Sequence, residues 1–187
     1  MHKLKAITPL GGCEPHVDTF DGVTISENPS RALVALTLRS VDGTAYEAAF
    51  KGAFGFQLPD VSRAVLTDDL GAFWIGPNSW MIDADYDAHA NFAQDLKDAV
   101  SDAASVVEQT DGWCRFDVDG ASVVSLFERL CAADVARMDV GHVTRTTIHH
   151  LSCFLWCIDT NTFAVIGPRS SARSLHHALT AAAKSVC

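Results

Sequence analysis

Basic residues are scarce in this sequence, and they form no run. The 187 residues include 14 lysines and arginines against 23 aspartates and glutamates, which gives a formal net charge of -9. Proteins that bind nucleic acid gather Lys and Arg on one face to neutralise phosphates. We therefore expect no nucleic-acid partner.

Long apolar runs are missing as well. No stretch of about 18 uninterrupted apolar residues occurs, so no membrane-spanning helix is predicted. The opening MHKLKAITPLGG is broken by Pro9 and two glycines, which is untypical of a secretory signal. The expected location is the cytoplasm, with no membrane partner.

The signatures of common catalytic and cofactor sites do not occur. There is no G-x-S-x-G nucleophile elbow, no Ser-x-x-Lys pair and no G-x-G-x-x-G nucleotide loop. Most acidic residues stand at expected turns or on helix faces, where caps and solvated charges are their usual roles. The sequence predicts no catalytic residue and no cofactor held by this chain.

Six cysteines are present, and none belongs to a Cys-x-x-Cys pair. In a reducing compartment they are expected as small buried hydrophobes. Cys153 and Cys157 share one strand face but lie about 13 Å apart, too far for one ion or a disulfide. The adjacent pairs His149–His150 and His176–His177 point in diverging directions on a strand or a helix. No metal site is predicted.

What is present is a repeated segment. FWIGPNS (73–79) and FAVIGPRS (163–170) share the core Ile-Gly-Pro, and each ends an apolar run that precedes an amphipathic helical pattern. Self-similarity of this kind indicates a duplication. We expect one α+β domain, built as an extended arm (1–20) and two pseudo-repeats (21–104 and 105–187).

Each pseudo-repeat has the pattern β-β-α-β-β(-β)-α, with mostly antiparallel sheets and helices on one face. In the first, strands 22–26 and 32–39 form a hairpin across Asn28–Ser30, and residues 63–67 supply a further strand. Its first helix opens with the capping box Thr44–Glu47 and ends at Gly55; its second is capped by Asp87. The apolar faces of these two helices are Tyr46, Ala49, Phe50, Ala53 and Phe54, and Phe92, Leu96 and Val100.

In the second, SVVEQ and WCRFDV flank Thr110–Gly112, a turn typical of hairpins. Strands follow at 143–149, 151–158 and 162–167. The apolar face of its first helix is Val124, Phe127, Leu130 and Cys131, and the last helix begins near Ser170 and buries Leu175, Ala178, Leu179 and Ala182.

The two tryptophans of FWIGPNSWMI raise the question of a binding face. With a four-residue loop at Gly76–Ser79, Trp74 pairs with Met81 and Ile75 with Trp80, so the tryptophans point to opposite faces. One tryptophan is then core, and we place Trp74 with Met81 on a face that meets a partner chain. Residues 151–158 are also apolar on both faces, which an antiparallel sheet normally avoids. Either the two halves pack together there, or a subunit interface covers it.

Two further places suggest partner contact. In WCRFDV, Trp113 and Arg115 alternate away from the apolar side, and Trp and Arg are enriched at interfaces. Arg169 stands at a helix amino terminus, where its charge is unfavourable. A partner carboxylate or phosphate would offset that charge; the alternative is a solvated arginine.

As a set in this order, WIGPNSWMI, VVEQTDGWCRFDVDG, Thr144–Thr146, CFLW and VIGPRSSARSLHHAL resemble the gamma subunit of heterotetrameric sarcosine oxidase. The resemblance implies a fold like the folate-binding domain of aminomethyltransferases and tRNA-modification GTPases. It also implies a complex that demethylates sarcosine to glycine, producing hydrogen peroxide and formaldehyde or 5,10-methylenetetrahydrofolate.

In that family FAD, FMN, NAD and zinc are held by other subunits, and tetrahydrofolate is used by the complex. The resemblance implies a non-catalytic structural subunit that meets the alpha, beta and delta subunits, mainly alpha. Two alternatives remain: a gamma-like subunit of a related N-methyl amino-acid dehydrogenase, and a stand-alone folate-binding, aminomethyltransferase-like protein. The transferases need extra domains to close the folate site, which speaks against the latter.

Overall fold

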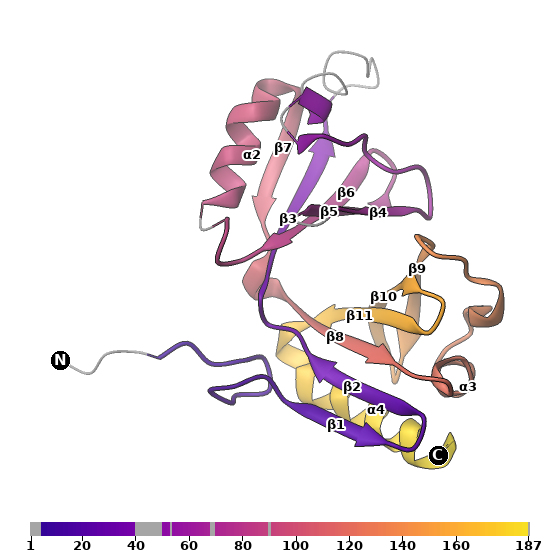
Figure 1. The fold of residues 1–187 in the computed structure, drawn as a ribbon. Coiled ribbons are helices and arrows are strands. Elements are labelled where there is room, and N and C mark those ends of the chain that lie inside the picture. Colours follow the sequence, from indigo (N-terminus) through magenta and orange to yellow (C-terminus); the bar gives the residue numbers. More distant parts are fainter. Residues whose placement is uncertain (1–4, 40–49, 53, 68–69, 90, 187) are drawn as a thin grey trace. The chain divides into compact units, whose positions relative to one another are not determined.

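The computed structural model describes residues 5–39, 50–52, 54–67, 70–89 and 91–186 (Figure 1). The chain divides into two compact units. We call Met1–Pro29 with Asp111–Cys187 the terminal unit, and Ser30–Thr110 the central unit. The expected fold class is confirmed: the described residues form antiparallel sheets accompanied by helices.

The terminal unit is built on a six-stranded antiparallel sheet in the order β1-β2-β8-β11-β10-β9. Its strands are β1 (Val17–Phe20), β2 (Val23–Glu27), β8 (Trp113–Asp119), β9 (Val143–Ile148), β10 (Leu151–Asp159) and β11 (Thr162–Pro168). Its helices are α3 (Val123–Leu130) and α4 (Ala172–Val186), with single turns η3 (Val135–Arg137) and η4 (Arg169–Ser171).

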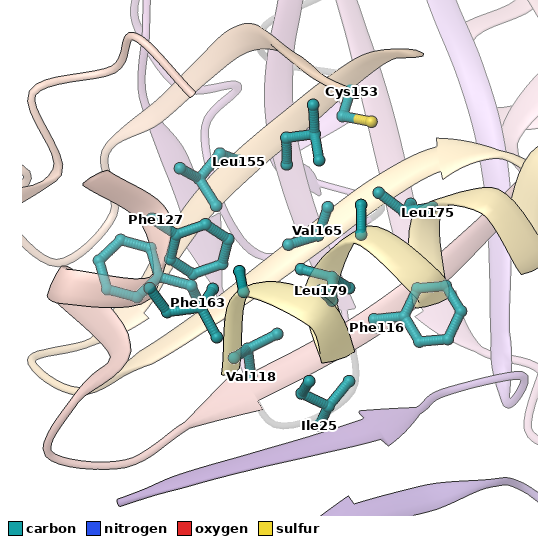
Figure 2. Close-up of a cluster of buried hydrophobic side chains, with 14 of the residues drawn as sticks. Ile25, Phe116, Val118, Phe127, Cys153, Leu155, Phe163, Val165, Leu175 and Leu179 are labelled. Atoms are coloured by element: carbon teal, nitrogen blue, oxygen red, sulfur yellow. The ribbon is translucent and has the colours of Figure 1, made fainter. Parts of the chain in front are cut away.

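The core of the terminal unit lies between one face of this sheet and the two helices. Alternate residues of β8 and β11, such as Phe116 and Val165, point to this face and meet Leu175 and Leu179 of α4 (Figure 2). All four side chains are fully buried. Removing four such side chains from water is worth on the order of 6–12 kcal/mol, which makes this contact a main source of stability.

The central unit has a five-stranded antiparallel sheet in the order β4-β5-β6-β3-β7. Its elements are β3 (Arg31–Leu38), β4 (Ala64–Leu66), β5 (Leu70–Gly76), β6 (Ser79–Asp85), α2 (Phe92–Val100), η1 (Ser101–Ala103) and β7 (Ala104–Glu108). The core joins Val34, Leu36, Trp80 and Ile82 of the sheet with the buried face of α2 and with Phe50. Single-turn η2 (Thr110–Gly112) follows β7.

The element order repeats, with one exchange. Both β2–α2 and β7–α4 contain two strands, a helical segment, three strands and a helix. The first strand of each repeat, however, belongs to the other unit's sheet: β2 pairs with β8, and β7 pairs with β3. The boundaries of the two compact units, near residues 29 and 110, therefore differ from those of the pseudo-repeats.

Both expected hairpins at the start of the repeats are wrong for this reason. Strand β2 pairs with β1 and β8 rather than with β3, and β7 pairs with β3 rather than with β8. The links Asn28–Ser30 and Thr110–Gly112 have the composition of hairpin turns. Since a turn motif specifies only local geometry, it does not decide which sheet the following strand joins.

The helix predictions are largely confirmed. Helix α2 buries Phe92, Leu96 and Val100, and α4 buries the four expected residues. Asp87 is not the cap of α2; Asn91 occupies that position. Helix α3 buries Phe127, as expected, together with Val123 and Leu126, which were not predicted. The other expected residues of its apolar face are partly buried and pack against the same core: Val124, Leu130 and Cys131.

The helix expected after residue 44 is seen only in part. Phe50, residues 51–52 and Phe54 are helical, and Gly55 follows with a φ of 79°. The Gly55 N–H donates to the Lys51 carbonyl at 2.9 Å, as at the glycine end of many helices. The capping box, Tyr46, Ala49 and Ala53 lie outside the described residues.

The Ile-Gly-Pro segments are not equivalent positions of the repeat. Gly76 ends β5, the middle one of the three successive strands β4, β5 and β6, and leads into the hairpin to β6. Gly167 lies in β11, the last strand of the corresponding run, and leads into η4 and α4. The order of elements repeats, but the Ile-Gly-Pro motif does not occupy matching positions in it, and the duplication stays a prediction.

The expected arm is partly structured. Residues Val17–Phe20 form the edge strand β1, whereas residues 5–16 contain no helix or strand. In the described parts of the chain, no helix has both the length and the apolar character needed to cross a membrane.

Candidate functional site

Trp74 and Trp80 lie on the same face of the central sheet, not on opposite faces. They are direct partners across the β5–β6 hairpin, because a register shift between Trp74 and Gly76 leaves Ile75 without a partner. One extra residue in a strand inverts the alternation beyond it. Trp80 is buried, and its indole N–H donates to the Pro59 carbonyl at 2.8 Å.

The pairing of Trp74 with Met81 as a partner face is therefore wrong. Trp74 is half-buried and packs against the central core. Met81 pairs with Phe73 and points to the other face, where it is 1% exposed. A partner cannot reach Met81 without rearrangement of this chain.

On β8, the expected alternation is confirmed. Cys114, Phe116 and Val118 belong to the terminal core. Trp113, Arg115 and Asp117 point to the opposite face of the sheet. We call the residues on this face Trp113, Arg115, Asp117, Phe154 and Trp156 the β8–β10 face.

Arg115 is held tightly on the β8–β10 face. Its Nε donates to Asp117 Oδ1 at 2.7 Å, and its Cζ lies 5.8 Å from the ring centre of Trp156. Asp117 also accepts from the Asn28 side-chain amide at 2.6 Å. The Arg115 side chain is only 9% exposed. Losing one partner of such a buried ion pair is costly, because the other charge is left uncompensated.

Trp113 is, together with Asp117, a partly accessible member of the β8–β10 face. It is half-buried, and its ring lies 5.6 Å from that of Phe154. Strand β10 is apolar on both sides, as expected: Cys153, Leu155 and Cys157 join the terminal core, while Phe154 and Trp156 are 4% and 1% exposed on the other side.

Arg169 stands at the start of a helical segment, as expected. It begins the single turn η4, and α4 starts three residues later at Ala172. Its Nη2 donates to the Ile7 carbonyl at 3.0 Å, so the chain's own amino-terminal segment provides a partner. Since Trp113 pairs with Pro168, Arg169 follows directly beside the Trp113 end of the β8–β10 face.

The structure thus brings three of the five predicted interface residues into one region. Trp113, Arg115 and Arg169 combine an aromatic ring with two guanidinium groups, a composition typical of protein contact surfaces. Trp74 and Met81 belong to the central unit and do not contribute to this region. Partner contact by these residues stays a prediction.

Three cysteines of the terminal core are buried thiols, as expected. Burial raises the pKa of Cys114 to about 11 and that of Cys153 to about 12, from an ordinary value of 9.0. Burial also raises the pKa of Cys157. Protonated, buried thiols are weak nucleophiles and weak metal ligands. These three residues therefore act as core side chains.

The histidine pairs differ from expectation. His149 and His150 are not on a strand; they form the two-residue turn between β9 and β10, with φ values of 46° and 68°. His176 and His177 do diverge on α4, but His176 meets residues that sequence reasoning did not consider. Its Nε2 lies 2.6 Å from Asp18 Oδ2, and Asp18 lies 3.2 Å from His16 Nε2.

This cluster joins residues 158 positions apart, which explains why it was missed. The only local signal is the spacing of His16 and Asp18, which places them on one side of an extended segment. Nothing in the sequence points from there to His176.

No protein-family model matches the sequence, and no curated protein matches it. Among solved structures, the fold is similar to a chain of the heterotetrameric sarcosine oxidase from Corynebacterium sp. U-96. The TM-score is 0.78 and the identity 20%, over 88% of this chain and 85% of that one. The fold is that of a heterotetrameric sarcosine oxidase chain.

A second similar structure is the glycine cleavage system aminomethyltransferase T from Bartonella henselae. The TM-score is 0.57 and the identity 16%, over 82% of this chain. Our chain spans only 44% of the transferase chain. At these identities the comparisons establish a shared fold.

Proposed function

We propose that this chain is the non-catalytic gamma subunit of a cytoplasmic, heterotetrameric sarcosine oxidase-like complex. The observation that carries the proposal is the similarity to a sarcosine oxidase chain along nearly the full length of both chains. The match to the aminomethyltransferase is weaker and leaves more than half of that enzyme without a counterpart.

On this proposal the reaction is carried out elsewhere in the complex. Sarcosine is oxidised on subunits that hold FAD, FMN and NAD, zinc is held by the smallest subunit, and the one-carbon product passes to tetrahydrofolate or leaves as formaldehyde. This chain binds neither the flavins nor NAD nor tetrahydrofolate and does not contain that zinc site; it stabilises the assembly, mainly through contact with the alpha subunit. The contact region is the end of the β8–β10 face that carries Trp113, with Arg169 beside it.

The test is co-expression with flavin-containing subunits from the same source. We expect a complex that co-purifies on a tag placed on this chain, carries flavin absorbance and oxidises sarcosine. A stable monomer that never co-purifies with a flavin-containing chain would overturn the proposal. Oxidation of N-methylglutamate in place of sarcosine would identify the related dehydrogenase instead.

Two half-buried tryptophans provide a matched comparison within this test. Trp113→Ala should lower the yield of complex several-fold more than Trp74→Ala, because only Trp113 lies in the proposed contact region. Urea unfolding of both isolated variants corrects for lost stability. If Trp113→Ala lowered the yield of complex only as much as it lowered the stability of the isolated chain, Trp113 would serve folding and not assembly. Arg115 is unsuitable, since its removal leaves Asp117 with a broken ion pair.

Titration of the isolated chain with tetrahydrofolate separates the remaining alternative. We expect no saturable binding. Saturable binding by the chain without a partner would favour a folate-binding, aminomethyltransferase-like protein.

A further inference from the structure

His16, Asp18 and His176 form a cluster at the junction of β1 and α4. The His176 Nε2 and His16 Nε2 atoms approach the same carboxylate oxygen, Asp18 Oδ2, at 2.6 and 3.2 Å. One ligand atom from each residue lies within 4.8 Å of the other two. We propose that this cluster binds a divalent transition-metal ion, with Zn²⁺ as the probe.

The topology explains why the three donors converge. His16 and Asp18 are two residues apart along the extended chain, so their side chains leave it on the same side. Asp18 pairs with Ile25 of the terminal core, which puts its side chain on the face of the sheet that α4 covers. His176 follows the buried Leu175 on α4, at the margin of that helix face nearest β1.

The donor set suits such an ion. Two imidazole nitrogens and one carboxylate oxygen are the ligands of many catalytic and exchangeable zinc sites, which keep the fourth position for water. With bonds of about 2.0–2.2 Å, tetrahedral ligand atoms lie about 3.3–3.5 Å apart. In the structure Asp18 Oδ2 lies 2.6 Å from His176 Nε2 and 3.2 Å from His16 Nε2. Both separations are shorter than this value, so binding of the ion requires the two imidazole rings to move slightly outward from Asp18.

Accessibility agrees with an open fourth position. The side chains of His16, Asp18 and His176 are 52%, 29% and 21% exposed. An ion can therefore enter from solvent, with His16 as the outermost ligand.

The neighbouring structure holds the donors in place. The backbone N–H of His16 donates to Glu27 Oε2 at 3.1 Å, and that of Leu10 to Glu27 Oε1 at 2.8 Å. Glu27 itself is 4% exposed. The His176 ring packs 5.8 Å from the ring of Phe116, and 5.2 Å from that of His16 at an angle of 81°. Ligands fixed by a second layer of contacts bind metal more tightly than mobile ones.

A bound ion would crosslink the amino-terminal segment that carries His16 and Asp18 to the last helix, α4. The hydrogen bond between Asp18 and His176 already joins β1 to α4, and the ion would replace it with three stronger bonds. This role does not depend on the proposed assembly.

The experiment uses the full chain after tag removal and chelator treatment, in a Cys13→Ser background, because Cys13 is exposed and nearby in sequence. Zn²⁺ binding is measured by competition with a chromogenic chelator and by thermal unfolding. We expect one tightly bound Zn²⁺ per chain and an unfolding midpoint that rises with Zn²⁺ concentration.

Asp18→Asn and His176→Gln should each weaken binding by about 100-fold or more, since loss of a direct ligand exceeds the effect of losing a supporting group. His177→Gln is the matched control, because the neighbouring histidine is exposed and lies outside the cluster. It should bind Zn²⁺ as the parent does. Circular dichroism and the metal-free unfolding midpoint establish that each variant is folded.

Substitution with Co²⁺ gives an independent readout. The visible spectrum should show Co²⁺ bound by nitrogen and oxygen, without a charge-transfer band from sulfur. A sulfur band, equal affinity in His176→Gln and His177→Gln, or absence of saturable binding would each overturn the proposal.

Discussion

Gly76 and Gly167 stand in the same tripeptide, Ile-Gly-Pro, but in different surroundings. A Cβ atom on Gly76 would meet nothing within 4 Å. A Cβ atom on Gly167 would lie 2.7 Å from Leu175 Cδ2 and 3.2 Å from Cys153 Sγ. Both neighbours are fully buried, so neither can move aside freely. At this scale, identical sequence has different consequences because the distant neighbours differ.

Gly167→Ala should therefore destabilise the protein by about 1–3 kcal/mol, the usual cost of overfilling a core. Gly76→Ala should change the free energy of unfolding by less than about 0.5 kcal/mol, as expected at an open position. Urea unfolding followed by tryptophan fluorescence measures both. Similar effects in the two variants would contradict the different environments of the two glycines.

At the scale of elements, each sheet includes a strand from outside its own pseudo-repeat. Strand β7 joins the central sheet, and strand β2 joins the terminal sheet. The central sheet needs β7, which lies beyond residue 103, and does not use β2. A fragment of residues 30–110 contains every strand of the central sheet. The pseudo-repeat 21–104 contains β2 and lacks nearly all of β7.

We expect the fragment 30–110 to show a cooperative thermal transition and the fragment 21–104 to show none. A sheet that lacks an edge strand exposes the apolar surface and backbone groups of β3. Circular dichroism during heating compares the two fragments at equal concentration. A cooperative transition in the fragment 21–104 and none in the fragment 30–110 would contradict the observed strand order, and would indicate that β2 completes the central sheet.

Elements were easier to predict from the sequence than their pairing. The spacing of Phe92, Leu96 and Val100 fixes a helix face, since the period is local. The partner of β2 is β8, about 90 residues away, as the Asn28–Asp117 hydrogen bond illustrates. The single unpaired residue Ile75 was enough to reverse the expected direction of Trp74 relative to Trp80. Register depends on cross-strand packing that no single segment contains.

At the scale of the whole molecule, the candidate sites combine distant segments. Trp113 and Arg115 could be predicted for the β8–β10 face, because alternation along one strand is visible in the sequence. The stacking of Arg115 on Trp156 could not, and neither could the meeting of Asp18 with His176. These contacts follow from strand order in the sheet and from how α4 crosses it.

The buried thiols give the stability of the molecule a specific dependence on alkaline pH. Cys114 and Cys153 remain protonated in the folded state up to a pKa of about 11 and about 12, whereas in the unfolded state they ionise near 9.0. Between these values the unfolded state binds fewer protons, so the free energy of unfolding falls as pH rises. Below pH 9.0 the stabilisation is fully present.

Each thiol should contribute a loss of up to about 1.4 kcal/mol per pH unit in this window. Urea unfolding at about pH 8 and about pH 10 should show a smaller pH-dependent loss in the double variant Cys114→Ala/Cys153→Ala than in the parent. Comparing the two proteins cancels the titration of lysines and tyrosines. Parallel losses in the two proteins would contradict the assignment.

Because β2 joins the terminal sheet and β7 joins the central sheet, neither pseudo-repeat contains a complete sheet of its own. A half-length chain built on this repeat would begin with a strand that its own sheet does not use, and would leave one sheet edge open. Two such chains could satisfy each other by trading those strands, which is domain swapping in a symmetric dimer. In the present chain the two halves are covalently joined. The exchange of strands is therefore intramolecular, and its equilibrium does not depend on the concentration of protein.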